Sequence, residues 1–193
     1  MKSKFSFVLI GGWAVYLYTN ALKSKDIDVL VSLNVLREIQ SAYPVTKNLR
    51  LKKYEFVAEG VSVDVYVEYY SEIGIPAEDI ISHRIQVSGF EVPVPEHLLV
   101  TKQKAEMERR GSEKGFKDRV DIISMLLYSN LDLKAYTSVL MKYNKWNYLS
   151  ELESIVSNAR EEFKQLGFTD LRKVKVIKRK ILKNIQEART AER

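Results

Sequence analysis

The chain of 193 residues contains no cysteine, only two histidines and only four prolines. The lack of cysteine excludes disulfides, thiolate metal sites and a cysteine nucleophile. The two histidines, His83 and His97, cannot by themselves complete a zinc site, so we expect no structural zinc. After residue 130 there is no proline and only one glycine, Gly167. That scarcity of chain breakers indicates a largely helical second half.

Basic and acidic residues are nearly balanced until the last part of the chain. Residues 171–193 hold nine Lys and Arg against two Glu, a net charge of +7, and the rest holds 22 basic and 23 acidic residues. Because residues 1–170 are nearly neutral, this chain is not a uniformly basic protein of the kind that coats nucleic acid. The basic end indicates either a localised anion-binding surface or a final helix whose lysines face solvent. A hydrophobic content of 46% is typical of a globular chain.

An uncharged run from Phe5 to Leu22 follows Lys2 and Lys4, and its composition resembles a signal peptide or a short membrane span. Gly11 and Gly12 interrupt the run, and polar residues dilute its second half. We therefore expect a buried strand, a glycine turn and a helix there, with no membrane contact and a cytoplasmic location. Membrane anchoring through this run is the alternative.

Apolar periodicity predicts an α/β half that ends near residue 94. The expected strands are Ser6–Ile10, Asp26–Val31, Leu51–Glu59 and Val61–Tyr69, with a further hairpin in residues 80–93. Glu59-Gly60 and Ser88-Gly89 have the composition of tight hairpin turns. Helices are expected directly after the two glycines and at Val35–Ala42.

The second half, from Pro95 on, has helical spacing throughout. We expect helices at Glu96–Arg110 and Phe116–Tyr128 and three more after Leu131. Val174, Ile177, Ile181 and Ile185 recur at helical spacing, so one face of the last helix is expected to be packed. The predicted fold class is α+β (α/β), with a mixed sheet and flanking helices in domain 1–94 and an all-helical domain 95–193.

Glycines and acids in the first half form a pattern that suits phosphate chemistry. Gly11 and Gly12 lie between a strand and a helix, where glycine lets a phosphate approach the backbone and the free N–H groups of the helix. Asp26 and Asp28 lie two apart, about 6–7 Å along one strand face. Such close acids repel each other unless a cation such as Mg²⁺ lies between them. The alternative is a solvated strand face.

Asp64 lies within Val-Asp-Val-Tyr-Val, an otherwise hydrophobic strand. A carboxylate in such a strand needs a partner or a metal ion, unless the strand lies at the edge of the sheet with its polar face in solvent. Ser62, Asp64 and Tyr66 share one face of this strand, and the valines share the other.

Together these residues resemble the nucleotidyltransferase superfamily, which shares its fold with DNA polymerase beta. The family pattern is a strand, Gly-Gly or Gly-Ser at a helix start, about ten residues, Asp-x-Asp or Asp-x-Glu, and a third acid on a later strand. Here thirteen residues separate Gly11-Gly12 from Asp26-Ile27-Asp28, and Asp64 follows. Ser24 fits the Ser-x-Asp-x-Asp form of some branches. Because the turn is Gly-Gly, backbone amides would replace a serine hydroxyl beside the phosphates.

Residues downstream resemble the AbiEii-like branch of this superfamily. Its motif is a helix with Lys and Arg, followed by Lys/Arg-Asp-x-x-Asp and a hydrophobic residue. The matching positions are Lys102, Arg109, Lys117, Asp118 and Asp121, and the resemblance covers roughly residues 6–128. Lys102 and Arg109 lie seven apart, on one helix face, where both could reach a triphosphate. The alternative is a salt-bridge network between helices.

The resemblance implies a Mg²⁺-dependent (or Mn²⁺-dependent) enzyme that transfers a nucleoside monophosphate from an NTP to a hydroxyl. Asp26, Asp28 and Asp64 would be the catalytic metal ligands. The remaining implied site residues would bind the nucleotide, with the helical domain completing the site: Gly11, Gly12, Ser24, Lys102, Arg109, Lys117, Asp118 and Asp121.

The resemblance leaves the acceptor open between an RNA or tRNA end, a protein and a small molecule. The branch includes toxins of toxin–antitoxin pairs, so an antitoxin partner is possible. The basic residues 171–193 suit an RNA acceptor. The alternative function is a nucleotide-binding regulatory or toxin–antitoxin partner protein without turnover.

Overall fold

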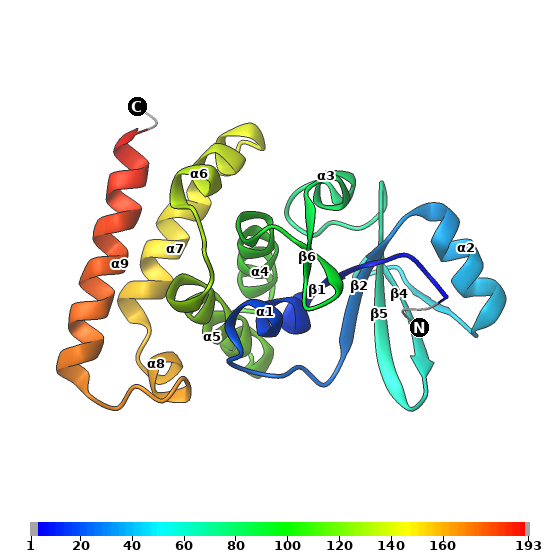
Figure 1. Cartoon of the computed structure of the whole chain (residues 1–193), viewed down its shortest axis with the longest axis horizontal. Helices are drawn as coiled ribbons and strands as arrows, with labels where there is room; N and C mark the ends of the chain where they lie inside the picture. The colour runs from blue at the N-terminus through cyan, green and yellow to red at the C-terminus, as the bar shows by residue number, and fades with distance from the viewer. Residues whose placement is uncertain (1–3, 192–193) are drawn as a thin grey trace. The chain divides into compact units, whose positions relative to one another are not determined.

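The computed structural model of the protein describes residues 4–191. The chain forms two compact units, Met1–Val94 and Pro95–Arg193. The first unit, shown in blue to green in Figure 1, combines a five-stranded sheet with helices, and the second, which we call the helical unit, contains only helices. This arrangement confirms the predicted α+β fold class, with a mixed sheet followed by an all-helical half.

The sheet of the first unit has the strand order β1-β2-β5-β4-β3. β2 and β5 pair in parallel, and the other neighbouring strands pair antiparallel, so the sheet is mixed. The strands are β1 (Val8–Ile10), β2 (Ile27–Val31), β3 (Thr46–Asn48), β4 (Lys53–Ala58) and β5 (Val61–Val67).

One face of the sheet forms the hydrophobic core of the first unit. Val63, Val65 and Val67 are buried, whereas the residues between them are more exposed, which confirms the predicted alternation along β5. Helix α2 (Leu33–Ala42) buries Leu36 and Ile39. Figure 1 shows α2 and α1 (Gly11–Thr19) on opposite sides of β2 and β5.

Two tight hairpins, both predicted, fix the register of the strands that they join. At Glu59 and Gly60 the backbone φ angles are 53° and 80°, as a two-residue primed turn requires. This turn places Ala58 opposite Val61 and thereby sets the pairing of β4 with β5. The second hairpin joins β6 (Arg84–Val87) to β7 (Phe90–Pro93).

Two short elements of the first unit were not predicted. Strand β3 has only three residues, all polar, so it lacks the apolar alternation that indicates a strand. Helix α3 (Ala77–Ser82) spans six residues, too few for a clear helical period. Strand β2 begins at Ile27, one residue later than predicted, so Asp26 lies in the bend before it.

The helical unit contains more helices than predicted. From Leu131 to Ala191 there are four rather than three, because the five-residue α8 (Glu161–Gln165) stands alone between two longer helices. The chain leaves helix α7 (Asn147–Asn158) at Ala159, whose ψ of 114° is extended, with no proline or glycine there to mark the break. The helices are α4 (Pro95–Arg109), α5 (Glu113–Tyr128), α6 (Leu133–Lys142), α7 (Asn147–Asn158), α8 (Glu161–Gln165) and α9 (Leu171–Ala191).

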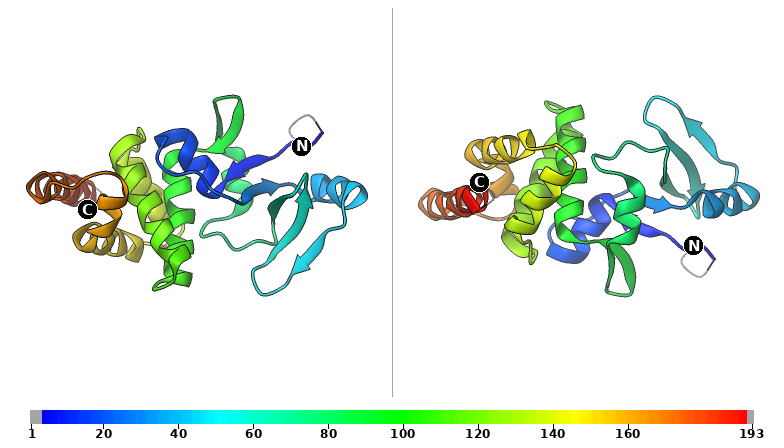
Figure 2. Two further views of the ribbon diagram at one scale, coloured as in Figure 1. Left: turned by 90° about the horizontal axis from the view of Figure 1, so that it is seen from below. Right: turned by 90° about the horizontal axis from the view of Figure 1, so that it is seen from above.

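Helix α9 packs along α6 and α7 (Figure 2), and it buries Val174, Ile181 and Ile185 of the predicted apolar stripe. A polar contact also lies in the core of this unit. The buried Gln103 donates to the carbonyl oxygen of Tyr148 at 2.8 Å and accepts the hydroxyl of Tyr136. Burial raises the pKa of Tyr136, so its hydroxyl stays protonated and donates this bond.

Within residues 4–191, no helix combines the length and the apolar composition that a bilayer crossing requires.

The corner between α4 and α5 depends on a close backbone approach. Helix α5 begins three residues earlier than predicted, because Ser112 caps it by accepting the N–H of Gly115 at 3.0 Å. Gly115 is buried, and a methyl group on its Cα would overlap the carbonyl oxygen of Arg109. The corner therefore has room for glycine only.

We predict that Gly115→Ala lowers the free energy of unfolding by about 1–3 kcal/mol, although alanine favours a helix over glycine by about 1 kcal/mol. Urea unfolding followed by circular dichroism measures the change. The control is Lys114→Ala at the exposed neighbouring position, which should change stability by less than about 0.5 kcal/mol. A gain in stability for Gly115→Ala would contradict the close approach.

Candidate functional site

The glycine pair lies where β1 passes directly into α1. Gly11 has a φ of 63°, in the left-handed region that favours glycine. A methyl group on Gly11 would overlap the carboxylate of Asp28, and one on Gly12 would come within 2.9 Å of the Cβ of Ser24. The structure thus brings Gly11, Gly12, Ser24 and Asp28 together, and the glycines leave the space that the two side chains occupy.

Asp28 and Asp64 lie side by side on neighbouring strands. They are register partners in the parallel pairing of β2 with β5, so their backbones lie about 4.8 Å apart and their side chains project from the same face. Both residues are half-buried. Two carboxylates this close need a cation beside them.

A lysine on β4 supplies a positive charge to Asp64. The Lys53 ammonium lies 2.5 Å from Oδ2 of Asp64 and 3.1 Å from Oε1 of Glu55. Burial lowers the pKa of Lys53, but its bonds to Asp64 and Glu55 outweigh burial and leave that pKa raised. Lys53 therefore stays protonated at neutral pH.

Glu55 continues the row of acids across the sheet. It lies directly opposite Asp64 in the pairing of β4 with β5. Asp28, Asp64 and Glu55 are thus successive neighbours on three adjacent strands, and Lys53 lies two residues from Glu55 on the same face. We call these four residues the acid row.

The geometry of the acids decides how well they suit a metal ion. Asp28 and Asp64 present oxygen donors of the kind that Mg²⁺ prefers, and their adjacent positions fit one divalent ion between them. The third predicted ligand, Asp26, is exposed in the bend before β2. In the part of the chain that the structure describes, no three acidic or histidine side chains converge as a metal site.

The predicted downstream residues form a second group, which lies within the helical unit. Arg109 donates to Asp118 in a bidentate pair, with Nε–Oδ2 at 2.5 Å and a terminal nitrogen–Oδ1 distance of 2.8 Å. Lys102 lies 3.3 Å from Asp118 and 2.6 Å from Asp121. These four side chains join α4 to α5, which is the salt-bridge network considered as an alternative. Lys117 is exposed and has no ion pair among those found in residues 4–191.

Most of this network is removed from water. The side chains of Asp118, Lys102 and Asp121 are 1%, 7% and 9% exposed, whereas that of Arg109 is 41% exposed. Burial raises the pKa of Asp121, and the nearby Lys102 opposes that rise. Two cations therefore neutralise two acids, and only Arg109 presents part of its charge to solvent.

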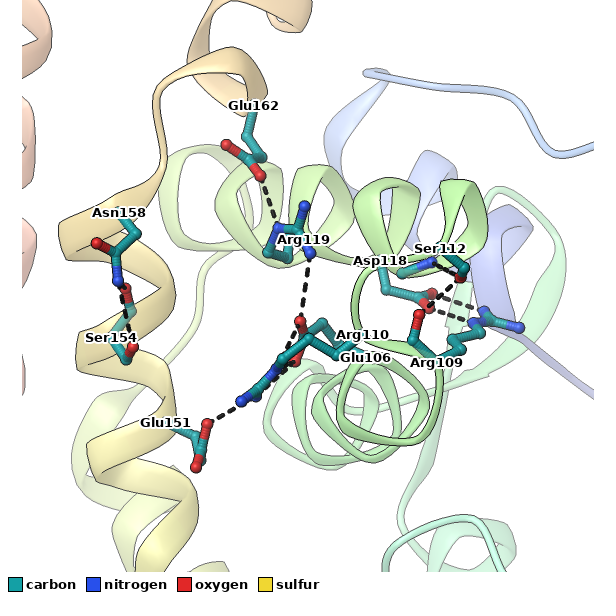
Figure 3. Close-up of polar contacts among 11 residues, drawn as sticks. Glu106, Arg109, Arg110, Ser112, Asp118, Arg119, Glu151, Ser154, Asn158 and Glu162 are labelled. Carbon is teal, nitrogen blue, oxygen red and sulfur yellow. Dashed lines mark hydrogen bonds and ion pairs between the residues drawn. The ribbon is translucent and has the colours of Figure 1, made fainter.

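A second ion-pair network, not predicted from sequence, surrounds Glu106 (Figure 3). The side chain of Glu106 is only 1% exposed, and it pairs with Arg110 at 2.9 Å and with Arg119 at 3.4 Å. Arg110 continues to Glu151 and Arg119 to Glu162, each at 2.7 Å. This network links α4, α5, α7 and α8, so its role is to hold the helical unit together.

The helical unit also has a pocket of about 670 Å³ between the end of α7, α8 and α9. Its lining contains five cationic side chains and a single acidic one, Glu161. The cations are Arg160, Lys164, Lys175, Lys178 and Arg179, and the apolar side chains include Phe168, Leu171, Val174 and Leu182.

Lys178 differs from the other cations of this pocket. Its ammonium donates to the carbonyl oxygens of Ser157 and Ala159, at 2.6 and 2.9 Å. Burial lowers its pKa. Its contacts to these carbonyl oxygens stabilise the C-terminus of α7. Lys164 pairs with Glu161, the acid of the pocket lining, at 3.6 Å.

Sequence reasoning missed Lys53 and Glu55, although a signal for both was present. A two-residue turn at Glu59-Gly60 pairs residue 58 with 61 and, by counting back, residue 55 with 64. The period of two then puts residue 53 on the same face as residue 55. The pocket residues 157–169 gave no comparable signal.

No family model matches the chain, and no curated protein matches it. Among solved structures, JHP933 from Helicobacter pylori is similar over 98% of this chain and 89% of its own, with a TM-score of 0.50 and 17% identity. At this identity the likeness is one of fold alone.

Two further solved structures are similar over 63% of this chain. An antigenic nucleotidyltransferase-like protein from Paracoccidioides brasiliensis matches over 67% of its length, with a TM-score of 0.38 and 17% identity. The Megavirus polyadenylate synthase matches over 28% of its length, with a TM-score of 0.44 and 16% identity.

We predict that Lys102→Met lowers the free energy of unfolding by about 3–5 kcal/mol, because it leaves Asp121 buried without its cation. Chemical denaturation measures this loss. Lys104→Met is the matched control on the same helix. Lys104 pairs with Glu108, and both side chains are more exposed, at 29% and 56%, so we expect a loss below about 1 kcal/mol. Equal effects of the two substitutions would contradict the buried network.

Proposed function

We propose that this protein is a Mg²⁺-dependent nucleotidyltransferase that moves a nucleoside monophosphate from an NTP to an acceptor hydroxyl. One observation carries the proposal. Asp28 and Asp64 are adjacent on β2 and β5, and Asp28 lies against Gly11 at the start of α1. Acids and a helix N-terminus are thereby combined at one place, as binding of a metal-bound triphosphate requires.

The N-terminus of α1 is the proposed phosphate site. Its N-cap residue, Ile10, makes no side-chain hydrogen bond to the helix, and no acidic residue of the helix itself occupies its first turn. A helix N-terminus offers N–H groups and a partial positive charge to an anion. Gly11 and Gly12 let the side chains of Asp28 and Ser24 lie against the backbone at this helix start, and the hydroxyl of Ser24 adds a further donor.

Asp28 and Asp64 would hold the Mg²⁺ ion, with Asp26 as an exposed third ligand. Bound there, the ion would neutralise phosphate oxygens and favour ionisation of the acceptor hydroxyl. The acceptor oxygen would attack the α-phosphorus, forming an O–P bond as the bond to pyrophosphate breaks. Asp64 would help to remove the hydroxyl proton.

The alternative function, a nucleotide-binding protein without turnover, is favoured by a different contact. Lys53 already neutralises Asp64 at 2.5 Å, and a paired acid is a weaker base and a weaker ligand. Label transfer separates the two functions, because only the enzyme moves the nucleotide to an acceptor.

We predict that replacing Asp26 and Asp28 with Ala lowers transfer from α-labelled NTP by at least about a hundredfold. Total RNA, total protein and small aminoglycosides are offered as acceptors in parallel, and the pool that retains label identifies the acceptor class. Glu38→Ala, an exposed acid on α2, is the control and should leave transfer unchanged. Undiminished labelling by the double variant would reject the proposal.

For the acceptor, we propose single-stranded RNA bound at the pocket beside α9. Five cations, one acid and several apolar side chains line this pocket. Such a lining suits RNA, because cations bind its phosphates and apolar side chains contact its bases. Lys175 and Arg179 are exposed on α9, one turn apart, where both could contact successive phosphates.

We predict that Lys175→Glu with Arg179→Glu weakens RNA binding at least tenfold and makes its salt dependence shallower, because about two phosphate contacts are lost. Fluorescence anisotropy with a labelled single-stranded RNA measures both effects. The matched control is Lys180→Glu with Lys183→Glu, which makes the same charge change on α9 outside the pocket lining. Equal losses in the two double variants would indicate attraction to the whole helix rather than binding in the pocket.

A further inference from the structure

The end of helix α8 turns the chain so that Phe168 lies against Phe163. Gly167 has a φ of 87°, in the left-handed region that favours glycine. The N–H of Phe168 donates to the carbonyl oxygen of Phe163 at 2.9 Å, and the N–H of Gly167 donates to that of Lys164 at 2.9 Å. These two bonds form a Schellman motif, in which the residue after the glycine packs on a residue five positions earlier. The motif therefore fixes the place of an aromatic ring.

The ring of Phe168 forms part of the pocket wall between α7, α8 and α9. The ring of Phe163 is fully buried and lies nearly perpendicular to it, with 5.7 Å between the centroids and 79° between the planes. Rings in this arrangement meet edge to face, so Phe163 covers at most one face of Phe168. Phe168 is half-buried, and the pocket therefore contains an aromatic ring that a buried ring holds in position.

Helix α9 gives the pocket a charged row and a mainly apolar row. Lys175 and Arg179 are exposed and lie four residues apart, so they form an outer row. Val174, Lys178 and Leu182 form an inner row at the same spacing. The ammonium of Lys178 is already bonded to carbonyl oxygens of Ser157 and Ala159. Charge for a phosphate thus lies beside apolar surface for a base.

The size and charge of the pocket suit one nucleotide. Its volume of about 670 Å³ is in the range of pockets that hold a single small molecule. Arg160, Lys175 and Arg179 line it and make no ion pair among those found in residues 4–191. A nucleotide within a strand has a phosphate on either side, and these exposed cations can neutralise both.

We propose that the pocket takes a single unpaired nucleotide of the RNA, whose base stacks on Phe168 while the flanking phosphates contact the outer row of α9. The inference rests on the proposed RNA acceptor and deepens it, because it assigns the base contact to one residue and limits it to one base. A base inside a duplex is stacked between its neighbours and cannot lie on Phe168. The pocket therefore selects RNA by an unpaired position rather than by sequence.

The test compares three labelled hexamers that share one ribose-phosphate chain and carry no base, one adenine or two adjacent adenines. Fluorescence anisotropy at a single salt concentration gives the Kd of each, so that the phosphate contacts are equal. The wild-type chain should bind the one-adenine hexamer at least about fivefold more tightly than the base-free one, as expected for one stacked base. We call this ratio the adenine gain. The second adenine should add no more than about twofold, because either base can enter but not both.

Substitutions at Phe168 show whether this residue provides the gain. Phe168→Leu, or Phe168→Met if the first variant is unfolded, keeps an apolar side chain without the ring and should abolish the adenine gain. Phe168→Tyr keeps the ring and should keep the gain. Phe116→Leu is the matched control, because Phe116 is a half-buried phenylalanine of the helical unit outside the pocket lining, and it should also keep the gain. Circular dichroism checks that each variant is folded.

Equal affinity of the wild-type chain for the base-free and one-adenine hexamers would overturn the inference. So would an adenine gain that persists without the ring at residue 168, as a merely structural role of Phe168 predicts, or a second gain of the same size from the second adenine. If Lys175→Glu with Arg179→Glu then still weakens binding of every hexamer, only the inference fails. If the wild-type chain binds no hexamer, the proposed RNA acceptor fails as well, and label transfer decides separately whether the chain is a nucleotidyltransferase.

Discussion

The parallel pairing of β2 with β5 decides where the functional side chains of the first unit lie. It sets Asp28 beside Asp64 and, through the β4–β5 hairpin, brings Glu55 and Lys53 to the same face. The pairing itself is held by the buried valines on the opposite face, because a slip of one residue would turn those valines toward solvent. Hydrophobic burial therefore sets the positions of the acids, and the repulsion between these acids destabilises the fold.

In both units, acids that are removed from water are neutralised by neighbouring lysine or arginine side chains. Burying a lone charge is expensive, and removing one partner of a buried pair is more so. In the first unit Lys53 accompanies the acid row, and in the helical unit Lys102 and Arg109 accompany Asp118 and Asp121. The near-neutral balance of residues 1–170 is thus the sum of local pairs, and charge is left unbalanced mainly on α9, which contributes three of the five cations that line the pocket.

Much of the first unit could be predicted because its signals are local. The alternation along β5, the two hairpin turns and the glycine pair each lie within a few residues. The spacing of Lys102 and Arg109 predicted that they share a helix face, but spacing cannot tell which partner they meet. Glu106 was missed because a glutamate on a helix is expected to face solvent, and the packing of four helices buries it. Elements such as β3 and α8 are too short to have a period.

Strand β3 forms one of the two edges of the sheet. β3 is the last strand in the order, so its outer backbone groups are not paired within the sheet. It is short and polar, and Lys47 at its centre lies over the rings of Tyr54 and Tyr70, with 5.5 and 4.6 Å to the centroids. A short strand that carries a lysine is a poor template for another strand. The β3 edge of the sheet is therefore unlike an aggregation-prone edge, which would be long, flat and apolar, and a strand from another chain would find few partners there.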